Sequence, residues 1–357
     1  MSRPRPRKKH ATLSDIAEAV GVAAMTVSRV VNGVGYVSDE TRDKVLKAVA
    51  ELNYRRNGLA RSLKRQSTET VGLVLGDISN PYSTELARGV REALLSEGFN
   101  LFICISEHGA DEDIVAFEAL AGHNVDGIIV ATRSNQRGDN YLRRLINSNV
   151  PVVGIGRDLR DGNVDVVLPD NLKGGFDATK HLLDLGHRRI AFIGASLGSG
   201  ANLRRLQGYL KALDDQAIEL DERLIVGQSD GTTEVVGYST EEIGFEAMLR
   251  LLELPDPPTA VFARNDLTAI GAMRAISNAG LRIPDDIAIV GFDDIPLAAR
   301  MSPPLTTVRQ PTRLEGKLAV EMLLERIKSL QQIRRRERIL DCELVVRGSS
   351  VGGQVSS

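Results

Sequence analysis

The sequence has 357 residues, of which 42% are hydrophobic and 26% are charged, and its formal net charge is −2. This composition is typical of a soluble globular protein, and the length is sufficient for two or three domains. No apolar run approaches the roughly 18 residues that cross a bilayer, and the N-terminus lacks the apolar core of a signal peptide. The sequence therefore excludes an integral membrane protein and predicts a cytoplasmic one.

The overall charge conceals an asymmetry between the start of the chain and the rest. Residues 1–65 contain 14 Lys and Arg against 6 Asp and Glu, whereas the remainder contains 31 against 41. Such a basic segment is typical of a module that binds phosphates, although a solvated basic face gives the same count. Its first part, residues 1–10, predicts a disordered arm that either touches phosphates without specificity or is only a tail.

Two short amphipathic helices are expected at Leu13–Val20 and Ala24–Asn32, joined by a tight corner at Gly21. Thr12 and Asp15 have the spacing of a capping box that opens the first helix. The pair is a candidate helix-turn-helix, in which the second helix enters a DNA major groove. The apolar residues expected to share its small core are Ala17, Val20, Val22, Val27 and Val30.

A third helix, about Ser38–Leu52, would close this core. Its apolar residues at helical spacing are Val45, Leu46, Val49 and Leu52. Ala23 precedes the second helix and has no side chain that can cap it, a loss typically worth about 1 kcal/mol. The alternative interpretation is an ordinary three-helix packing unit without DNA contacts.

From residue 70 onwards, strand-like apolar runs alternate with helical stretches, which predicts parallel sheets with right-handed crossovers. The runs are 71–75, 101–105, 126–131, 150–156, 189–194, 259–264 and 287–294. An amphipathic helix at Thr312–Leu330 and a last strand near Ile339–Val346 follow. The tail after Gly348 has no leucine heptads, so we expect a dimer and no tetramerisation helix.

Ligands in such sheets bind beyond the carboxyl ends of the strands, so the loops there are candidate binding sites. Tyr82, after the first run, could stack on a ligand ring. Four of these loops or helix starts carry an arginine, namely Arg133, Arg157, Arg205 and Arg264. Guanidinium groups bind carboxylate and phosphate in bidentate fashion, so the hypothesis is an anionic effector. In the opposing interpretation these arginines pair with Asp293, Asp294 or Asp158.

Other chemistries find little support in the sequence. Cys104 and Cys342 lie far apart without histidines at metal-binding spacing and are expected to be buried thiols. The glycine-rich stretch 194–202 lacks the Lys-Ser/Thr pair of a phosphate-binding loop. No nucleophile–base arrangement is evident. We therefore expect no enzyme activity, no metal and no cofactor.

One stretch carries a dense and specific resemblance. Its matching residues are Thr12–Ala17, Gly21-Val22, Thr26–Asn32, Val37-Ser38, Thr41-Arg42, Val45, Leu52–Tyr54 and Ala60–Lys64. Together they resemble the lac repressor (LacI/GalR) family of bacterial transcription regulators, and looser similarity extends over nearly the whole chain. The resemblance implies an all-α helix-turn-helix headpiece and a hinge helix. These would be joined to an α/β core like that of periplasmic binding proteins, with two doubly wound parallel-sheet subdomains.

The domain boundaries follow from this resemblance. We expect an arm at 1–10, a headpiece at 11–56, a hinge at 57–66, a core at 67–347 and a flexible tail at 348–357. The chain would cross between the two subdomains near 155–170, 295–305 and 328–338.

The resemblance also assigns DNA contacts. Ala24 and Met25 would be the main base readers, through apolar contacts such as that with a thymine methyl, and Arg29 would contact guanine. Leu63 would wedge into the minor groove and kink the operator. In a plainer interpretation the hinge is only a linker. The full set of expected DNA-binding residues is Thr12, Leu13, Ala24, Met25, Thr26, Ser28, Arg29, Asn32, Tyr36, Ser38, Tyr54, Asn57, Ala60 and Leu63.

For the effector, the resemblance points to Asn265, Asp293 and Gln310 as groups that bind hydroxyls or polar edges, although each could instead cap a helix or form a turn. Asp266 is expected to be such a cap. The family usually has an Asp where this chain has Gly156 followed by Arg157. The full set of expected effector-binding residues is Tyr82, Ser83, Arg133, Arg157, Arg205, Asn265, Asp293 and Gln310.

The resemblance implies a repressor that binds a palindromic operator as a dimer and is gated by a sugar, sugar acid or sugar phosphate. It would work in the bacterial cytoplasm, on the nucleoid when bound to its operator. Two alternatives remain open: the same regulator gated by a protein co-regulator, and a cytoplasmic ligand-binding protein or enzyme on the same fold. The sign of the effector's action cannot be read from the sequence.

Overall fold

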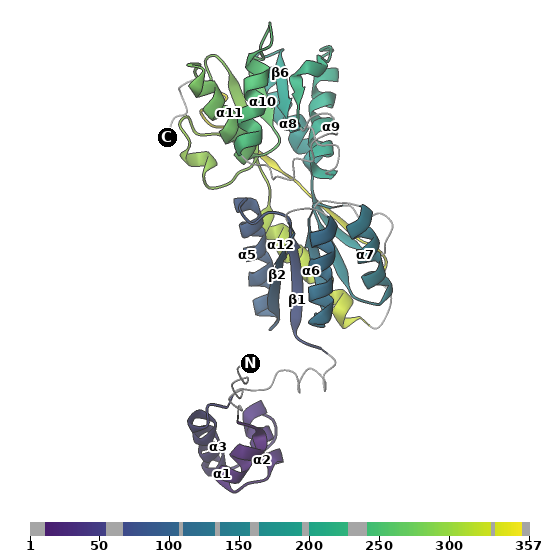
Figure 1. Ribbon diagram of the computed structural model, residues 1–357, viewed down its shortest axis with the longest axis vertical. Helices are drawn as coiled ribbons and strands as arrows, with labels where there is room; N and C mark the ends of the chain where they lie inside the picture. The colour runs from purple at the N-terminus through teal and green to yellow at the C-terminus, as the bar shows by residue number, and fades with distance from the viewer. Residues whose placement is uncertain are drawn as a thin grey trace, which may run out of the picture. The chain divides into compact units, whose positions relative to one another are not determined.

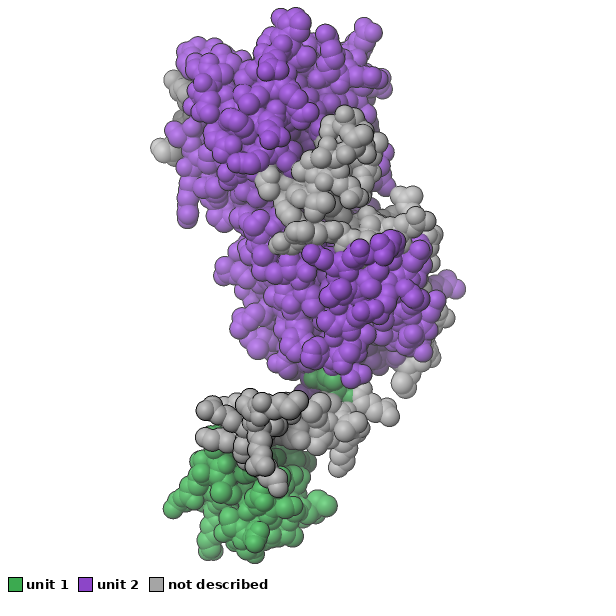
Figure 2. Space-filling view, in the orientation of Figure 1, with its two compact units in different colours: residues 1–68 green, residues 69–357 purple. Residues whose placement is uncertain are grey.

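A computed structural model of the chain describes residues 11–54, 67–106, 110–132, 136–157, 164–194, 200–227, 241–329 and 333–351. The chain divides into two compact units, residues 1–68 and 69–357 (Figure 2). The expected arm and hinge lie outside the described residues. None of the described helices is long and apolar enough to cross a membrane.

The described residues of the first unit form three helices, α1 (Leu13–Val20), α2 (Ala24–Asn32) and α3 (Asp39–Glu51) (Figure 1). Ile16 and Val27 are completely buried in its core, as is a valine of α3, Val45. These helices and their bounds agree with the sequence prediction.

Two of the residues expected to close this core do not do so. Leu46 is 49% exposed and Leu52 is 40% exposed, whereas Ala48 is buried. Leu46 follows the buried Val45 by one residue, so it points about 100° away around the helix. Leu52 lies beyond the last helical residue, where it forms the C-cap.

The second unit contains two sheets of six strands each, and each sheet has helices on both faces (Figure 1). The strand order is β11-β5-β4-β3-β1-β2 in the first sheet and β12-β10-β9-β8-β6-β7 in the second. Every pairing is parallel except that of β10 with β12. We call the two halves the first and the second lobe.

The first lobe has strands β1 (Thr70–Leu75), β2 (Asn100–Ile105), β3 (Gly127–Ala131), β4 (Val152–Ile155), β5 (Asp165–Pro169) and β11 (Glu337–Leu340). Its helices are α5 (Pro81–Ser96), α6 (Ala110–Gly122), α7 (Gln136–Asn147) and α12 (Thr312–Lys328). One face of the sheet packs on α5 and α12 through residues such as Leu86 and Leu323, and the other packs on α6 and α7 through Phe117 and Leu142. This lobe is therefore doubly wound.

The second lobe has strands β6 (Ile190–Ile193), β7 (Ile225–Val226), β8 (Ala260–Ala263), β9 (Ala288–Asp293), β10 (Thr306–Arg309) and β12 (Glu343–Val345). Its helices are α8 (Asn171–Asp184), α9 (Gly200–Asp214), α10 (Glu241–Leu252) and α11 (Asp266–Asn278), with 3-10 turns at Glu222–Leu224 and Ala298–Arg300. Two hydrophobic clusters flank this sheet: Tyr209 lies in the one formed with α8 and α9, and Met248 in the one formed with α10 and α11.

Three strands, β5, β7 and β10, were not predicted from the sequence, and one predicted strand corresponds to two separate strands. β5 and β7 are short, and β10 begins with Thr306 and Thr307, which are fully buried although polar. The Thr306 hydroxyl donates to the Arg347 carbonyl oxygen at 2.9 Å, which satisfies it in the interior. The expected strand at 339–346 is divided at Asp341 between β11 of the first sheet and β12 of the second.

The chain passes between the sheets three times. The first crossing lies between β5 and α8, near residue 170 and at the end of the expected range. The second and third occur at 310–311 and 341–342, later than the expected 295–305 and 328–338. The second crossing is later because the overlooked strand β10 extends the second lobe before the chain leaves it. The third is later because β11, at Glu337–Leu340, still belongs to the first sheet.

The core extends beyond the expected boundary at residue 347. Ser349 and Ser350 are buried. The Ser349 hydroxyl donates to the Ile289 carbonyl oxygen at 2.7 Å, and its carbonyl oxygen accepts from the Ile289 amide at 2.8 Å. The expectation of a flexible tail from residue 348 is therefore wrong for residues 348–351, because Ser349 bonds to the interior strand β9 beside the start of β10.

Candidate functional site

The starts of α1 and α2 differ in how their amide groups are satisfied. The Thr12 hydroxyl accepts the Asp15 amide at 3.3 Å, and Asp15 accepts the Thr12 amide at 2.7 Å, so the expected capping box is present. At α2, Ala23 provides no side-chain hydrogen bond. The first turn of α2 therefore keeps amide groups that an external acceptor can bind.

Helix α2 has a buried and an exposed side. Val27, Val30 and Val31 are buried. Of the expected base readers, Ala24 is exposed and Met25 is 66% exposed, and Arg29 is exposed one turn further on. Thr26 and Ser28 are half-buried, and Asn32 donates to the Ser28 hydroxyl at 3.1 Å.

The loop after α2 adds a further exposed residue, Tyr36, which is 93% exposed. Gly35 lies against the Arg29 side chain: a Cβ at this glycine would be 3.6 Å from the Arg29 Cδ. Ser38 is exposed and donates to the Thr41 hydroxyl at 2.9 Å, and Leu13 and Tyr54 are half-buried. The expected DNA-binding residues Asn57, Ala60 and Leu63 lie outside the described residues.

Charge is distributed unevenly along the N-terminal segment. Only four of the 14 Lys and Arg of residues 1–65 lie in 11–54, together with all six of the Asp and Glu. The folded helices are thus slightly acidic, and the basic surplus comes from the segments on either side of them. Contacts with phosphates that depend on salt are expected to come mainly from those segments.

In the second unit, Asp293 at the end of β9 is the best-connected candidate. Its carboxylate accepts a hydrogen bond from the Gln310 amide at 2.6 Å and another from Asn80. It also lies 3.8 Å from the Arg205 guanidinium. Burial raises the pKa of Asp293 to about 6, although Arg205, Gln310 and Asn80 counteract this effect. Asp293 thus joins the first lobe, the second crossing and the second lobe.

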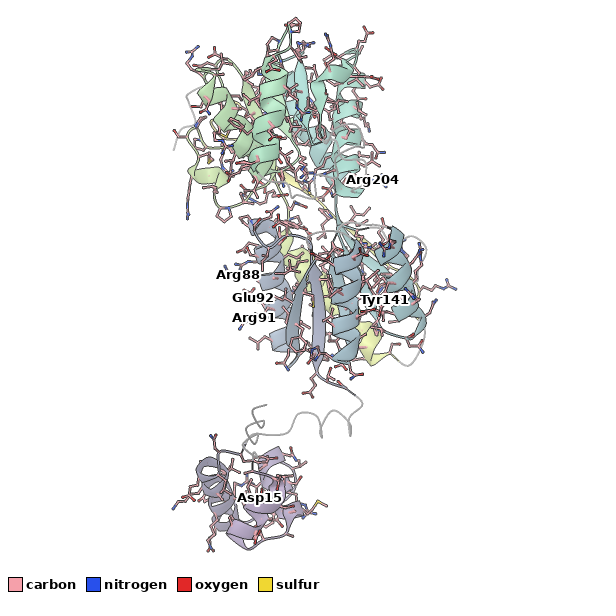
Figure 3. All side chains as sticks on the ribbon, viewed as in Figure 1. Asp15, Arg88, Arg91, Glu92, Tyr141 and Arg204 are labelled. Carbon is pink, nitrogen blue, oxygen red and sulfur yellow. The ribbon has the colours of Figure 1, made fainter. Side chains whose placement is uncertain are left out.

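Arg205 is held by several buried partners. It donates to Asn171 at 2.7 Å and to the Arg264 carbonyl oxygen, and its guanidinium lies 3.7 Å above the centre of the Phe292 ring. Burial lowers its pKa, and Asp293 partly offsets that. The neighbouring Arg204 is exposed on α9 and does not join this cluster (Figure 3).

Arg157 has its own partners within the first lobe. It donates to the Thr132 hydroxyl at 2.7 Å and forms an ion pair with Asp139 of α7. Burial lowers the pKa of Arg157 to about 10, and Asp113 acts in the opposite direction. The expected cluster of four arginines is therefore not a set of open charges, since Arg157 and Arg205 both face carboxylates.

The other two predicted arginines are Arg133 and Arg264, and the other two expected partners are Asp158 and Asp294. Among the described residues, Arg264 and Asp294 do not pair with each other. Arg133 and Asp158 lie outside the described residues. Arg264 is buried, and its carbonyl oxygen accepts from Arg205. Asp294 pairs with Arg309 and with Arg347, each at 2.7 Å.

Asn265, and not Asp266, caps helix α11, which is the structural alternative considered for Asn265. Asn265 is the N-cap of α11, where its side-chain oxygen accepts the Thr268 amide at 3.0 Å. Asp266 is not the cap: it is fully buried and accepts the Thr307 hydroxyl and, at 2.8 Å, the Ile295 amide. A cap must lie outside the helix, and Asp266 is already its first helical residue.

Tyr82 reaches a residue that the sequence reasoning missed. Its hydroxyl donates to the Glu315 carboxylate at 2.8 Å, and Glu315 is fully buried in the first turn of α12. Burial raises the pKa of Glu315 to about 7, the Tyr82 bond lowers it and Asp293 raises it further. The signal was an acidic residue four positions before Ala319 on the buried stripe of α12. Ser83, beside Tyr82, is buried in α5.

Tyr82, Asp293 and Gln310 line one cavity of about 380 Å³, together with Asp294 and Leu314. A larger groove of about 670 Å³ runs between α5 and α12 and includes Glu92, on the outer side of α5 (Figure 3). The smaller cavity lies at strand ends, where sheets of this kind bind ligands, so we take it as the candidate effector site.

Comparison with known proteins identifies both units. Residues 12–57 match the family described as bacterial regulatory proteins, lacI family, and residues 179–350 match the periplasmic binding protein-like domain. The chain is 36% identical to the HTH-type transcriptional repressor PurR of Mannheimia succiniciproducens, over 95% of this chain and 98% of that protein. It is 38% identical to the ribose operon repressor of Haemophilus influenzae, with the same coverage of 95% and 98%.

Solved structures agree. The lac repressor dimer bound to operator and the anti-inducer ONPF superposes with a TM-score of 0.82 at 28% identity, covering 96% of this chain and all of that one. The complex of the transcriptional regulator CelR with cellobiose gives a TM-score of 0.71 at 34% identity, covering 95% and 99%. The chain therefore belongs to the lacI family of bacterial regulatory proteins, and it is a DNA-binding transcriptional regulator whose core is built for control by a small molecule.

Proposed function

We propose that this regulator represses transcription by binding a palindromic operator as a dimer, and that a small metabolite in the 380 Å³ cavity changes its affinity for the operator. The observation that carries the proposal is the position of Asp293. It contacts Asn80 of the first lobe, Gln310 of the second crossing and Arg205 of the second lobe. A ligand that replaces any of these contacts changes the relation between the lobes.

The DNA is read by the exposed side of α2. Ala24 and Met25 carry no hydrogen-bond donors in their side chains, so they discriminate bases through apolar contact with a thymine methyl. Arg29 provides a guanidinium that matches the two acceptors of guanine. The uncapped start of α2 presents amide groups and the positive end of the helix dipole to a phosphate.

The other expected contacts complete this interface. Thr12, Ser28, Asn32, Ser38 and Tyr54 fix the position of the headpiece on the phosphates, and Leu63 supplies the minor-groove wedge. A dimer places two such headpieces on half-sites related by the twofold axis, which is why the operator is expected to be palindromic. Acting on bacterial promoters, the protein works in the cytoplasm and on the nucleoid when bound.

The pairing of the predicted arginines favours a neutral effector over the anionic one predicted from the four arginines. Arg205 lies beside Asp293, and Arg157 is paired with Asp139, so neither guanidinium offers an uncompensated charge to a carboxylate or phosphate. Asp293 and the Gln310 amide are suited to the hydroxyl groups of a sugar. The solved relatives include a cellobiose complex and a member with bound ribose, both neutral sugars.

The proposal is tested with the full-length protein and a labelled operator selected from random DNA. Fluorescence anisotropy then measures operator affinity with and without D-ribose, cellobiose, D-gluconate and ribose 5-phosphate. We expect one neutral sugar to change the affinity, and the DNA to change the affinity for that sugar by the same factor. If D-gluconate or ribose 5-phosphate changed the operator affinity more than the neutral sugars, the hypothesis of an anionic effector would be supported instead. If no small molecule changes operator affinity, metabolite control is refuted and a protein co-regulator takes its place.

A further inference from the structure

Glu315 is a buried carboxyl group whose hydrogen bonding is incomplete. It has no exposed surface, and Tyr82 donates to its Oε2 at 2.8 Å. Its Oε1 is also buried and has no hydrogen-bond partner within the part of the chain that the structure describes. Buried polar atoms are nearly always satisfied in folded proteins, so an exception calls for an explanation such as a missing ligand.

The surroundings do not compensate its charge. Glu315 takes part in none of the ion pairs among the described residues. The cation that acts on Glu315, Arg205, is already bound to Asn171 at 2.7 Å and lies beside Asp293. Asp293 itself acts on Glu315 as a like charge. An isolated buried carboxylate is unfavourable, so this position is poorly suited to a purely structural role.

The location connects Glu315 to the candidate effector site. Tyr82, which is partly exposed, lines the 380 Å³ cavity with its ring and bonds to Glu315 with its hydroxyl. Leu314, the residue before Glu315, lines the same cavity. The carboxyl group therefore lies directly behind the cavity wall, and rotation of the Tyr82 ring opens a path to it.

We propose that Glu315 determines effector specificity: its free oxygen accepts a hydrogen bond from a hydroxyl group of a neutral, polyhydroxylated effector that enters the cavity and displaces the Tyr82 ring. This rests on the proposed function, because it assumes an effector in that cavity. A carboxylate at this position repels acids and accepts from sugar hydroxyls, which adds a second reason for a neutral ligand. Asp293 and Gln310 would bind other polar edges of the same molecule.

A proton linkage follows from the same geometry. The groups that act on Glu315 are Tyr82 from α5, Asp293 after β9 and Arg205 from α9, and Glu315 in turn acts on Cys342 at the third crossing. Burial raises the pKa of Glu315 to about 7 in the free protein. A hydroxyl that donates to Oε1 favours the ionised form, so binding releases a proton near neutral pH.

The test is isothermal titration calorimetry of the full-length protein with D-ribose, cellobiose, D-gluconate and D-glucosamine. The variants are Glu315→Leu, which removes the acceptor, and Glu315→Gln, which keeps an acceptor but cannot ionise. Glu321→Leu, at an exposed position of the same helix, is the matched control. We expect a neutral sugar to bind the wild type and the control, and Glu315→Leu to weaken that binding about tenfold or more.

The dependence on pH separates a specificity role from a structural one. We expect the affinity of the wild type for the sugar to rise about tenfold from pH 6 to pH 8, with proton release, and that of Glu315→Gln to stay flat. Unchanged affinity in Glu315→Leu would overturn the proposal and leave metabolite control intact. Tighter binding of D-gluconate, or a large preference for the amine of D-glucosamine, would also overturn it.

A second measurement, the melting temperature, needs no ligand. It tests the proposal even if none of the four probes binds. Removing a buried carboxyl that the fold does not use is expected to leave the melting temperature of Glu315→Leu equal to that of the wild type or to raise it. A clearly lower melting temperature than that of Glu321→Leu would show that Glu315 holds the structure together and would refute a ligand role.

Discussion

The two ends of helix α12 each meet a fully buried carboxyl group, and the protein treats the two in opposite ways. Near the last turn, Asp165 of β5 accepts bonds from Arg326 at 2.7 and 2.8 Å and from the Arg336 guanidinium and amide, both at 2.7 Å. In the first turn, Glu315 has the Tyr82 hydroxyl and no cation. Burial acts to raise the pKa of Asp165, but the arginine bonds outweigh it and lower the pKa.

The difference shows how a buried charge can be assigned to structure or to function. Asp165 ties β5, α12 and the segment before β11 together, and every one of its bonds is internal. Glu315 is equally inaccessible but keeps an oxygen without a partner among the described residues. Burial alone therefore does not distinguish a structural carboxylate from one kept for a ligand. The completeness of the hydrogen bonding does.

The largest effect is expected when Asp165, the buried carboxylate paired with arginines, is replaced. Asp165→Leu removes the counter-charge of Arg326 and leaves Arg336 with its ion pair to Glu325. The free energy of unfolding should therefore fall by about 3 to 5 kcal/mol. Urea denaturation followed by circular dichroism measures it. A loss smaller than that caused by Glu315→Leu would reverse the comparison.

The next effect concerns pH and differs in sign between the two groups. The pKa of Glu315 is raised from 4.5 to about 7 on folding, so its contribution to stability is present at pH 4.5 and is lost as the pH rises to about 7. The loss relative to Glu315→Gln should approach about 3 kcal/mol. For Asp165 the pKa is lowered, so its contribution holds above 3.8 and disappears only as the solution becomes more acidic. Thermal unfolding of Glu315→Gln, Asp165→Leu and the wild type from pH 2 to pH 8 checks the two signs.

A smaller effect, on operator binding, is expected from replacing Arg29, whose guanidinium is exposed at the protein surface. Arg29→Ala should weaken operator binding by about 1 to 3 kcal/mol and relax the preference for one base pair. Arg29→Lys keeps the charge but loses the bidentate geometry, so it should recover affinity more than specificity. Anisotropy titrations against operators altered at single positions measure both. Equal losses for every operator would show that Arg29 contacts only phosphate.

The smallest effect extends the contrast to the headpiece, where α1 is capped and α2 is not. Ala23→Ser should supply the missing cap and stabilise the headpiece by about 1 kcal/mol, whereas Thr12→Ala should destabilise it by a similar amount. Hydrogen exchange of the α1 and α2 amides in the full-length protein measures both changes. If Ala23→Ser also weakens operator binding, the amides at the start of α2 are used by DNA. Unchanged exchange in both variants would contradict this account of capping.

Much of the fold was accessible from the sequence because hydrophobic periodicity reports local structure directly. The headpiece helices and seven core strands were located from apolar spacing alone. What was missed departs from that pattern for a physical reason: β10 buries Thr306 and Thr307, whose hydroxyls find partners only in the folded structure. The crossing at 310–311 was displaced for the same reason, and the crossing at 341–342 was displaced because β11 belongs to the first sheet.

The candidate site was less predictable. Sequence position indicated that Arg157 and Arg205 come near strand ends, and the opposing interpretation named Asp293 as a partner, but nothing indicated that Asp139 faces Arg157. Asp139 lies on a separate helix, and such long-range pairs leave no trace in spacing. Glu315 was overlooked because one acidic residue in a charged amphipathic helix looks like part of its solvated face. Only its burial and the Tyr82 bond reveal it.

The path of the chain through the two lobes has a consequence for synthesis. The first lobe requires α12 and β11, which ends at Leu340, and the second requires β12 and the buried Ser349 and Ser350. The first lobe is therefore incomplete before residue 340 has been made, and the second before residue 350. The three helices of the headpiece are complete by residue 51. Because domains emerge and fold from the N-terminus onwards, a nascent chain contains a folded DNA-binding headpiece long before it contains the effector-binding lobes. A ribosome that stops early would therefore release a headpiece without metabolite control, and a deletion that removes β12, Ser349 and Ser350 would disturb the second lobe while leaving the three headpiece helices intact.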